Sequence, residues 1–304
     1  MKKKIIVICT CLAGVILISG NSNGILVKSS DITVSITPET PEEEKSYYVE
    51  NQTRIFQQKE EEKRYNIHYN MCMIQKCEYQ AIYLQALKEE LESKRKIEEG
   101  KLDLGYTTQI SVQDIDTQLK EVIMQMETVQ EQEKYYKEVV SIYGGEYAAL
   151  GIGETVSELS EDYINEFLKD NLQIKYYEYQ IKTYEEYLRE HKEAENVEDI
   201  RIQKQIAELD KKKYEADLQI YVKGKVLQYE TILRNITQMN DEIELTEEKI
   251  RINNTLCENG KTTEISIIEL KTEQKRLMYE KMSLVYDADC IRYILEHKIE
   301  GVEI

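Results

Sequence analysis

GYTTQISVQDIDTQ, residues 105–118, returns at residues 260–273 as GKTTEISIIELKTE. Six of the fourteen positions are identical, and five more are close substitutions such as Gln for Glu and Val for Ile. The two copies begin 155 residues apart, about half of the 304-residue chain. A repeat at this separation predicts an internal duplication, in which one structural unit is built twice along a single chain.

The composition around this repeat predicts long helices. Pro38 and Pro41 are the only prolines, so no helix breaker occurs in the 263 residues after Pro41. Apolar residues recur at spacings of three and four, most clearly between Ile67 and Leu91. The expected fold class is all-α, with long antiparallel helical hairpins. We expect helices at about 42–103, 112–143, 161–192, 200–257 and 267–297.

The chain is expected to divide into five segments. Residues 1–24 carry three lysines, a fourteen-residue apolar run and then small polar residues, which is the layout of a secretory signal peptide. An uncleaved anchor is the alternative, although about 20 apolar residues are needed to span a bilayer. The other segments are an extended N-terminal segment at 25–44, a first helical hairpin repeat at 45–143, a linker at 144–160 and a second helical hairpin repeat at 161–304.

Charge and motifs exclude several functions. The chain has 58 acidic and 40 basic residues, a formal net charge of −18, which disfavours nucleic acid as a partner. The three histidines are far apart, and no metalloprotease, nucleophile-elbow or phosphate-loop motif occurs. Outside the signal segment no two cysteines have CxxC spacing. We therefore expect no enzyme, no cofactor and no metal site, with the cysteines buried as small apolar side chains.

The repeated turn has a local physical explanation. Gly105 and Gly260 can end a helix, because glycine accepts the left-handed conformation of a C-terminal cap. Ser111 and Ser266 are suitable N-caps for the returning helix. The turn is therefore expected to stop one helix at glycine and to start the next at serine.

Two acidic residues follow the serines at the spacing of a capping box. Asp114 and Glu269 each lie three residues after a predicted N-cap, where a carboxylate can accept a hydrogen bond from the N-cap backbone. Ile110 precedes the first N-cap and is placed to pack on Ile115 as a hydrophobic staple. A stable hairpin does not require Thr107-Thr108 and Thr262-Thr263 to be kept in both copies.

The pattern G-x-x-T-x-x-S-[VI]-x-[DE]-[IL] after a long amphipathic helix resembles the TolC-like outer-membrane efflux family. The resemblance covers roughly residues 50–297, and the stretch at 142–174 is similar to the family's mid-chain connection. It implies an α-helical barrel, usually a trimer, whose tip carries two such turns per chain. That tip docks on a membrane-fusion adaptor, which links it to an inner-membrane or ABC-type pump.

The resemblance implies roles for several residues of this chain, assigned by their positions in the repeated pattern. Asp114 and Glu269 fall where family members often place acids that face the pore, and rings of negative charge favour cations. The capping-box interpretation competes for these two residues, and the two are not exclusive. The residues that fall on the adaptor-docking tip are Gly105, Thr108, Ser111, Gly260, Thr263 and Ser266.

The sequence departs from the family at the membrane insertions. Residues 194–199, AENVED, are too short for membrane strands of about 9–11 residues each. The first insertion point and the half-helix before it are missing, and residues 30–44 can supply one short strand at most. We expect a TolC-like α-barrel protomer without a membrane β-barrel.

Two functions follow from these expectations. The first is an exported TolC-like component of an efflux or secretion assembly, a homo-oligomeric tunnel that docks on an adaptor outside the cytoplasmic membrane. The second is a structural coiled-coil spacer or surface protein of the cell envelope without a transport role. The doubled turn favours the first, because a generic coiled coil has no reason to repeat Thr-Thr at half-chain spacing.

Overall fold

The structure is a computed structural model that describes residues 25–29, 32–36, 42–150, 163–169, 171–193 and 196–300. The expected signal peptide at 1–24 and most of the expected linker lie outside these residues. The chain divides into two compact units, residues 1–61 and 62–304. The elements are β1 (Ile25–Ser29), β2 (Ile32–Ile36), α1 (Glu42–Asp103), α2 (Gln109–Ile142), α3 (Tyr163–Lys169), α4 (Leu172–Glu190), α5 (Val197–Glu258) and α6 (Glu264–Glu296).

The first unit contains a β-hairpin and the first turns of α1. Strands β1 and β2 pair antiparallel, with Ile25 opposite Ile36 and Ser29 opposite Ile32. As expected, residues 30–44 supply one short strand, β2. Its partner β1 is the run ILVKS at residues 25–29, just before that segment. This run is rich in residues that favour strands and is separated from β2 by two residues, the commonest hairpin spacing.

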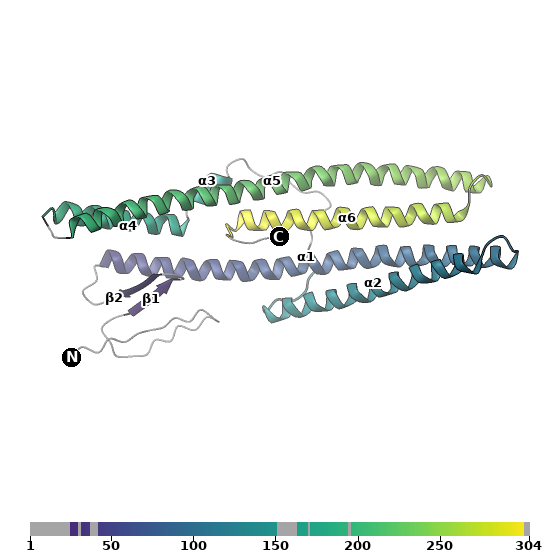
Figure 1. Cartoon of the computed structure of the whole chain (residues 1–304), viewed down its shortest axis with the longest axis horizontal. Coiled ribbons are helices and arrows are strands. Elements are labelled where there is room, and N and C mark those ends of the chain that lie inside the picture. Colours follow the sequence, from purple (N-terminus) through teal and green to yellow (C-terminus); the bar gives the residue numbers. More distant parts are fainter. Residues whose placement is uncertain are drawn as a thin grey trace. The chain divides into compact units, whose positions relative to one another are not determined.

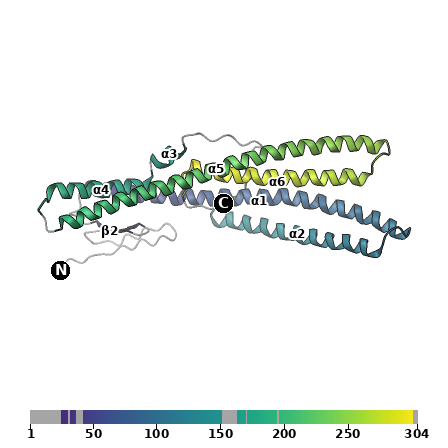
Figure 2. The same cartoon turned by 45° about the horizontal axis from the view of Figure 1, so that its top comes forward.

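The second unit is a set of long helices with shorter helices alongside them. Helices α1 and α5 have 62 residues each, which corresponds to about 90 Å at about 1.5 Å per residue. Figures 1 and 2 show α2 along the C-terminal half of α1, α6 along the C-terminal half of α5, and α4 along the N-terminal half of α5. The all-α class is confirmed for this unit. The matching lengths are what a duplication would produce, but the duplication itself stays a prediction.

Two apolar clusters hold the second unit together. One lies between α1 and α2, where the buried residues recur every seven positions: Cys77, Leu84 and Leu91 on α1, Val122 and Val129 on α2. This spacing keeps the side chains on one face of each helix, as the apolar periodicity predicts. The larger cluster joins α1, α3, α4, α5 and α6, and its fully buried members include Tyr229, Phe167, Val222 and Ile291.

The observed helix boundaries differ from expectation in two ways. The helix expected at 161–192 is broken into α3 and α4, because the Asn171 side chain caps α4 by accepting hydrogen bonds from the backbone of Gln173 and Ile174 at 3.0 and 3.1 Å. Helices α2, α5 and α6 begin three residues earlier than expected. Among the described residues, no helix combines the length and apolar character needed to cross a bilayer.

Candidate functional site

The two turns predicted as docking tips lie at the same end of the second unit (Figure 1). We call residues 104–111 tip 1, which joins α1 to α2, and residues 259–266 tip 2, which joins α5 to α6. An ion pair between Lys94 of α1 and Glu269 of α6, at 2.8 Å, holds the hairpins together a few turns behind the tips. The sequence-predicted tip residues are therefore brought to one end of the fold.

Glycine ends the incoming helix in both tips, as predicted. Gly105 has φ +75° and Gly260 has φ +65°, a conformation that residues with a side chain rarely adopt. In tip 1 the backbone N–H groups of Gly105 and Tyr106 donate to the carbonyls of Leu102 and Lys101, at 2.9 and 2.8 Å. Tip 2 makes the same pair of bonds at the same two lengths. Both helix ends are Schellman motifs.

The start of the outgoing helix differs from the prediction. Ser111 and Ser266 are not the N-caps, because their backbone N–H groups already donate to the carbonyls of Thr108 and Thr263, at 3.1 and 3.2 Å. The threonines occupy the N-cap positions, with extended backbones that suit a β-branched residue. Their hydroxyls pair with the serine hydroxyls at 3.3 and 3.0 Å rather than capping the backbone.

The capping boxes predicted for Asp114 and Glu269 are therefore wrong, since the serine N–H groups they would bind are already bonded. Asp114 is exposed on α2. Its neighbour Asp116 binds Arg95 of α1 at 2.7 Å. Partial burial lowers the pKa of Lys94, but its hydrogen bonds to Glu269 and Glu90 outweigh this and raise it. Adjacent residues of α1 thus bind α2 on one side and α6 on the other.

The two tips have the same backbone conformation but differ in the polarity of their exposed side chains. The sequence analysis did not predict this difference. Leu104, Tyr106 and Ile110 of tip 1 are 72%, 81% and 67% exposed, so the predicted staple at Ile110 does not form. The residues at the corresponding places of Leu104 and Tyr106 in tip 2 are Asn259 and Lys261. Aligning the two copies for polarity instead of identity would have revealed an apolar tip 1 and a polar tip 2.

A row of exposed apolar side chains runs along α5. Several of them lie seven residues apart, a spacing that keeps them on one side of a helix. Each is about half exposed or more in the single chain, although leucine and isoleucine usually turn away from water. The row consists of Ile202, Ile206, Leu209, Ile220, Leu227, Leu245 and Ile252.

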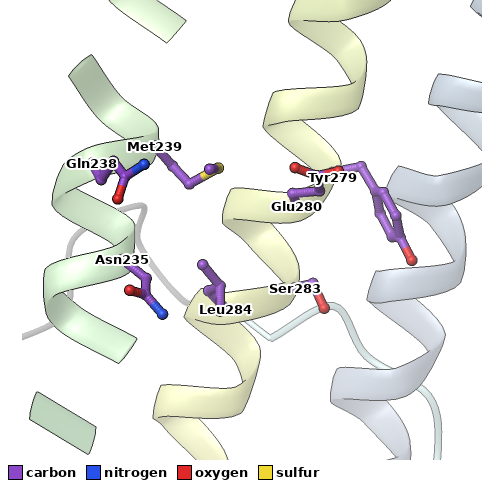
Figure 3. A pocket seen from close by; sticks show the side chains of 7 residues that line it. All are labelled: Asn235, Gln238, Met239, Tyr279, Glu280, Ser283 and Leu284. Carbon is purple, nitrogen blue, oxygen red and sulfur yellow. The ribbon is translucent and has the colours of Figure 1, made fainter. Parts of the chain in front are cut away.

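A groove of about 340 Å³ lies between α5 and α6 (Figure 3). Its lining contains one carboxylate, Glu280, which already binds Arg276 at 2.5 Å. Tyr279 points away from α5 toward α1, where its ring stacks on Tyr83 with centroids 6.3 Å apart. The groove therefore offers hydrogen-bonding and apolar surface, and its acid is engaged in an ion pair.

Neither a protein-family model nor a curated protein sequence matches the chain. Solved structures do match it. CusC, which forms a transmembrane channel, aligns at 10% identity and a TM-score of 0.59 over 77% of this chain and 74% of its own. A membrane protein from Pseudomonas aeruginosa aligns at 8% identity and a TM-score of 0.58, over 83% and 70%. The outer membrane protein VceC from Vibrio cholerae aligns at 11% identity and a TM-score of 0.53, over 79% and 70%.

The chain has the helical fold of the TolC-like outer-membrane efflux proteins. The resemblance drawn from the repeated turn is therefore confirmed for the fold. Within this TolC-like fold, the six predicted docking residues form two turns of the same backbone geometry. Of the predicted pore acids, Glu269 is tied to the α1–α6 contact, whereas Asp114 lies on the exposed face of α2.

Proposed function

We propose that this protein is an exported component of an efflux or secretion assembly. It forms a homo-oligomeric helical tunnel and docks on a membrane-fusion adaptor through its two tips. The observation that carries this proposal is the pair of Schellman turns at one end of a TolC-like fold. Two long hairpins that only served as a spacer would not need the same turn, with the same Thr–Ser hydroxyl pair, in both hairpins.

The tips are suited to close contact with another helix end. A Cβ atom built on Gly105 or Gly260 would meet nothing within 4 Å in this chain, so the glycines leave open space on the outside of each turn. Thr108 and Thr263 are exposed beside them. An adaptor can therefore approach the backbone directly, which is one of the recurring uses of glycine at binding sites.

The apolar row on α5 supports a homo-oligomer. In water an exposed row of leucine and isoleucine is unfavourable, at about 25 cal/mol for each Å² of apolar surface, and a second copy of the chain would cover it. Repetition around a closed ring places this face of each chain against its neighbour. We propose a trimer, since that is the usual assembly implied by the resemblance.

In such a ring the carboxylate of Asp114 in each chain faces the pore. Glu269, which is paired with Lys94, adds a second carboxylate per chain. A ring of carboxylates favours cations in a narrow pore. The partners of the assembly are the adaptor and an inner-membrane or ABC-type pump. Its place is the cell envelope, outside the cytoplasmic membrane.

The docking step is tested by photo-crosslinking in the cells that produce the protein. A photoreactive amino acid is placed at Thr108 or Thr263, where the side chain is exposed and makes no capping bond to the backbone. Matched controls carry it at Thr128 of α2 and Thr237 of α5, exposed threonines on the order of 30–40 Å from the tips. The proposal expects crosslinks to a membrane-fusion adaptor from the tip positions alone.

Other crosslinking patterns would decide against docking. Adaptor crosslinks that are equally strong from the control positions would show contact along the whole helix instead of at the tips. An absence of adaptor crosslinks from either tip, with the protein folded and exported, would favour a structural spacer of the envelope.

A further inference from the structure

Three metal-binding side chains meet where the start of the second unit packs on its last helix. His68 and Cys72 lie four residues apart on α1 and therefore share one helix face. Asp289 approaches them from α6, 221 residues further along the chain than His68. The His68 Nε2 atom is 2.6 Å from Asp289 Oδ2 and 3.8 Å from Cys72 Sγ. All three donor atoms lie within 4.8 Å of one another.

The cluster is buried, which separates it from the many exposed acids of this chain. Cys72 is completely buried, Asp289 is 2% exposed, and the His68 side chain is 18% exposed. The ring of Tyr293 stacks on the His68 ring, with centroids 4.6 Å apart, and fixes its orientation. Buried donor atoms with a fixed orientation are characteristic of a preorganised metal site, since neighbouring groups orient the ligands that bind a metal.

A second thiol and an unsatisfied hydroxyl surround the three donors. Cys290 follows Asp289 on α6, and like Cys72 it is a buried free cysteine of the larger cluster. Tyr65 is also buried, and its hydroxyl has no hydrogen-bond partner among the described residues. Tyr65, Cys72 and Cys290 all belong to the same buried cluster of the second unit. Buried polar groups usually have a partner, and one without a partner requires an explanation.

We propose that His68, Cys72 and Asp289 bind a divalent transition metal ion, with Zn²⁺ the ion that best fits this ligand set, and that the ion fastens α1 to α6. Imidazole, thiolate and carboxylate are the three side-chain ligands of protein zinc sites. The fourth tetrahedral position is open to the Cys290 thiolate or to water, which could bond to the Tyr65 hydroxyl.

The geometry allows an ion to enter with small movements. Zinc bonds of about 2.0–2.3 Å at tetrahedral angles place ligand atoms roughly 3.3–3.7 Å apart. The Cys72–His68 separation is already close to this range. The His68–Asp289 pair must open by roughly 0.7 Å from its present 2.6 Å, which exchanges one ion pair for two metal bonds.

The charged residue next to Asp289 supports a structural metal site that links α1 to α6. Arg292 binds the other oxygen of Asp289 and holds the carboxylate from behind, as partners of metal ligands commonly do. The ion would join the first and last helices of the second unit, which no other described covalent or metal link does. This site is independent of the proposed transport function. The sequence does not reveal it, because Asp289 lies 221 residues from His68.

The site is tested with metal added to the metal-free full-length protein. Zn²⁺ uptake is measured by equilibrium dialysis, and Co²⁺ serves as a spectroscopic probe of the ligands. We expect one bound ion per chain, the visible bands of tetrahedral Co²⁺ with a thiolate-to-metal charge-transfer band, and a higher Tm with Zn²⁺ than with a chelator. The variants His68→Gln, Cys72→Ser and Asp289→Asn should each lose the spectrum and the metal-dependent shift in Tm.

Cys77→Ser is the matched control, because Cys77 is a buried cysteine of the same helix outside the cluster. It should keep the Co²⁺ spectrum and the Zn²⁺-dependent Tm. Binding that survives in all three cluster variants, or Co²⁺ bands without a thiolate contribution, would overturn the proposal. So would a reduced, folded protein that takes up no metal, or a Cys72–Cys290 disulfide in the protein as isolated from its producing cells.

Discussion

Lys94 on α1 and Glu269 on α6 form an ion pair at 2.8 Å, and the next residue, Arg95, binds Asp116 of α2 at 2.7 Å. Two consecutive side chains of one long helix thus hold the half-length helices of both hairpins. The contacts lie ten to eleven residues before Gly105, just behind the two tips. They set the spacing at which the two tips are presented.

These ion pairs are expected to position the hairpins more than to stabilise them. A double-mutant cycle with Lys94→Met and Glu269→Gln should give a coupling free energy of about 0.2–1 kcal/mol, because both side chains remain partly exposed. Urea unfolding of the four proteins measures it. The coupling should shrink as salt is added. A coupling unaffected by molar salt would mean that the contact is not the electrostatic pair described here.

The left-handed glycines of the tips are expected to resist substitution. Gly260→Ala should lower the free energy of unfolding by about 1–2 kcal/mol, because an L-residue is strained at φ +65° although space is open around it. Gly224→Ala is the control, since Gly224 lies inside α5 with open space beside it and should gain about 0.5–1 kcal/mol. If the urea midpoints of both variants shifted in the same direction from that of the parent, the left-handed conformation at the helix end would be contradicted.

The raised pKa of Tyr147 is expected to make the folded state less stable at alkaline pH. Burial and the hydrogen bond that Tyr147 donates to Glu78, at 2.7 Å, raise the pKa of Tyr147 from 10.0 to about 12. The neutral phenol is therefore favoured in the folded state, and its stabilising effect is complete below pH 10 and lost as the pH rises through 12. Urea unfolding at several pH values should show a shallower decline in Tyr147→Phe than in the parent.

Tyr106→Phe serves as the control for that titration, because Tyr106 is 81% exposed on tip 1 and should leave the decline unchanged. The absence of tryptophan in the chain makes the phenolate absorbance easy to follow. Identical pH profiles for Tyr147→Phe and the parent protein would show that the Tyr147–Glu78 bond does not stabilise the fold.

The helices and their glycine stops could be predicted because they depend on local chemistry. The lack of proline after Pro41 and the three- and four-residue apolar spacing are enough to place α1 within its observed bounds. The glycine stops follow from the conformational freedom of one residue. The resemblance in sequence to TolC-like proteins rests on the same kind of local pattern, since it was carried by the repeated turn.

The features that could not be predicted depend on a choice between similar residues or on contacts between residues far apart in the sequence. Thr108 and Ser111 are both suitable N-caps, and the sequence gives no way to see that the backbone turns extended at the threonine. Asp114 and Asp116 are both acidic, and only the packing of α2 on α1 selects Asp116 for Arg95. His68 and Asp289 meet across 221 residues, so no local spacing announces their cluster.

The α1–α2 cluster is expected to dominate the stability of the first hairpin. Leu84→Ala should cost about 2–5 kcal/mol, because Leu84 is 1% exposed between the two helices and its loss leaves a cavity. Leu104→Ala, on the exposed tip of the same helix, should change stability by less than about 0.5 kcal/mol. Equal costs for the two variants would place the core elsewhere.

The proposed oligomeric tunnel is tested by the mass of the exported protein in solution, measured by light scattering after size exclusion. We expect a trimer that becomes a folded monomer when Ile220 and Leu227 of the α5 row are replaced by lysine, with helicity unchanged. A parent protein that stays monomeric at every accessible concentration, or a trimer that the two lysines leave intact, would contradict it.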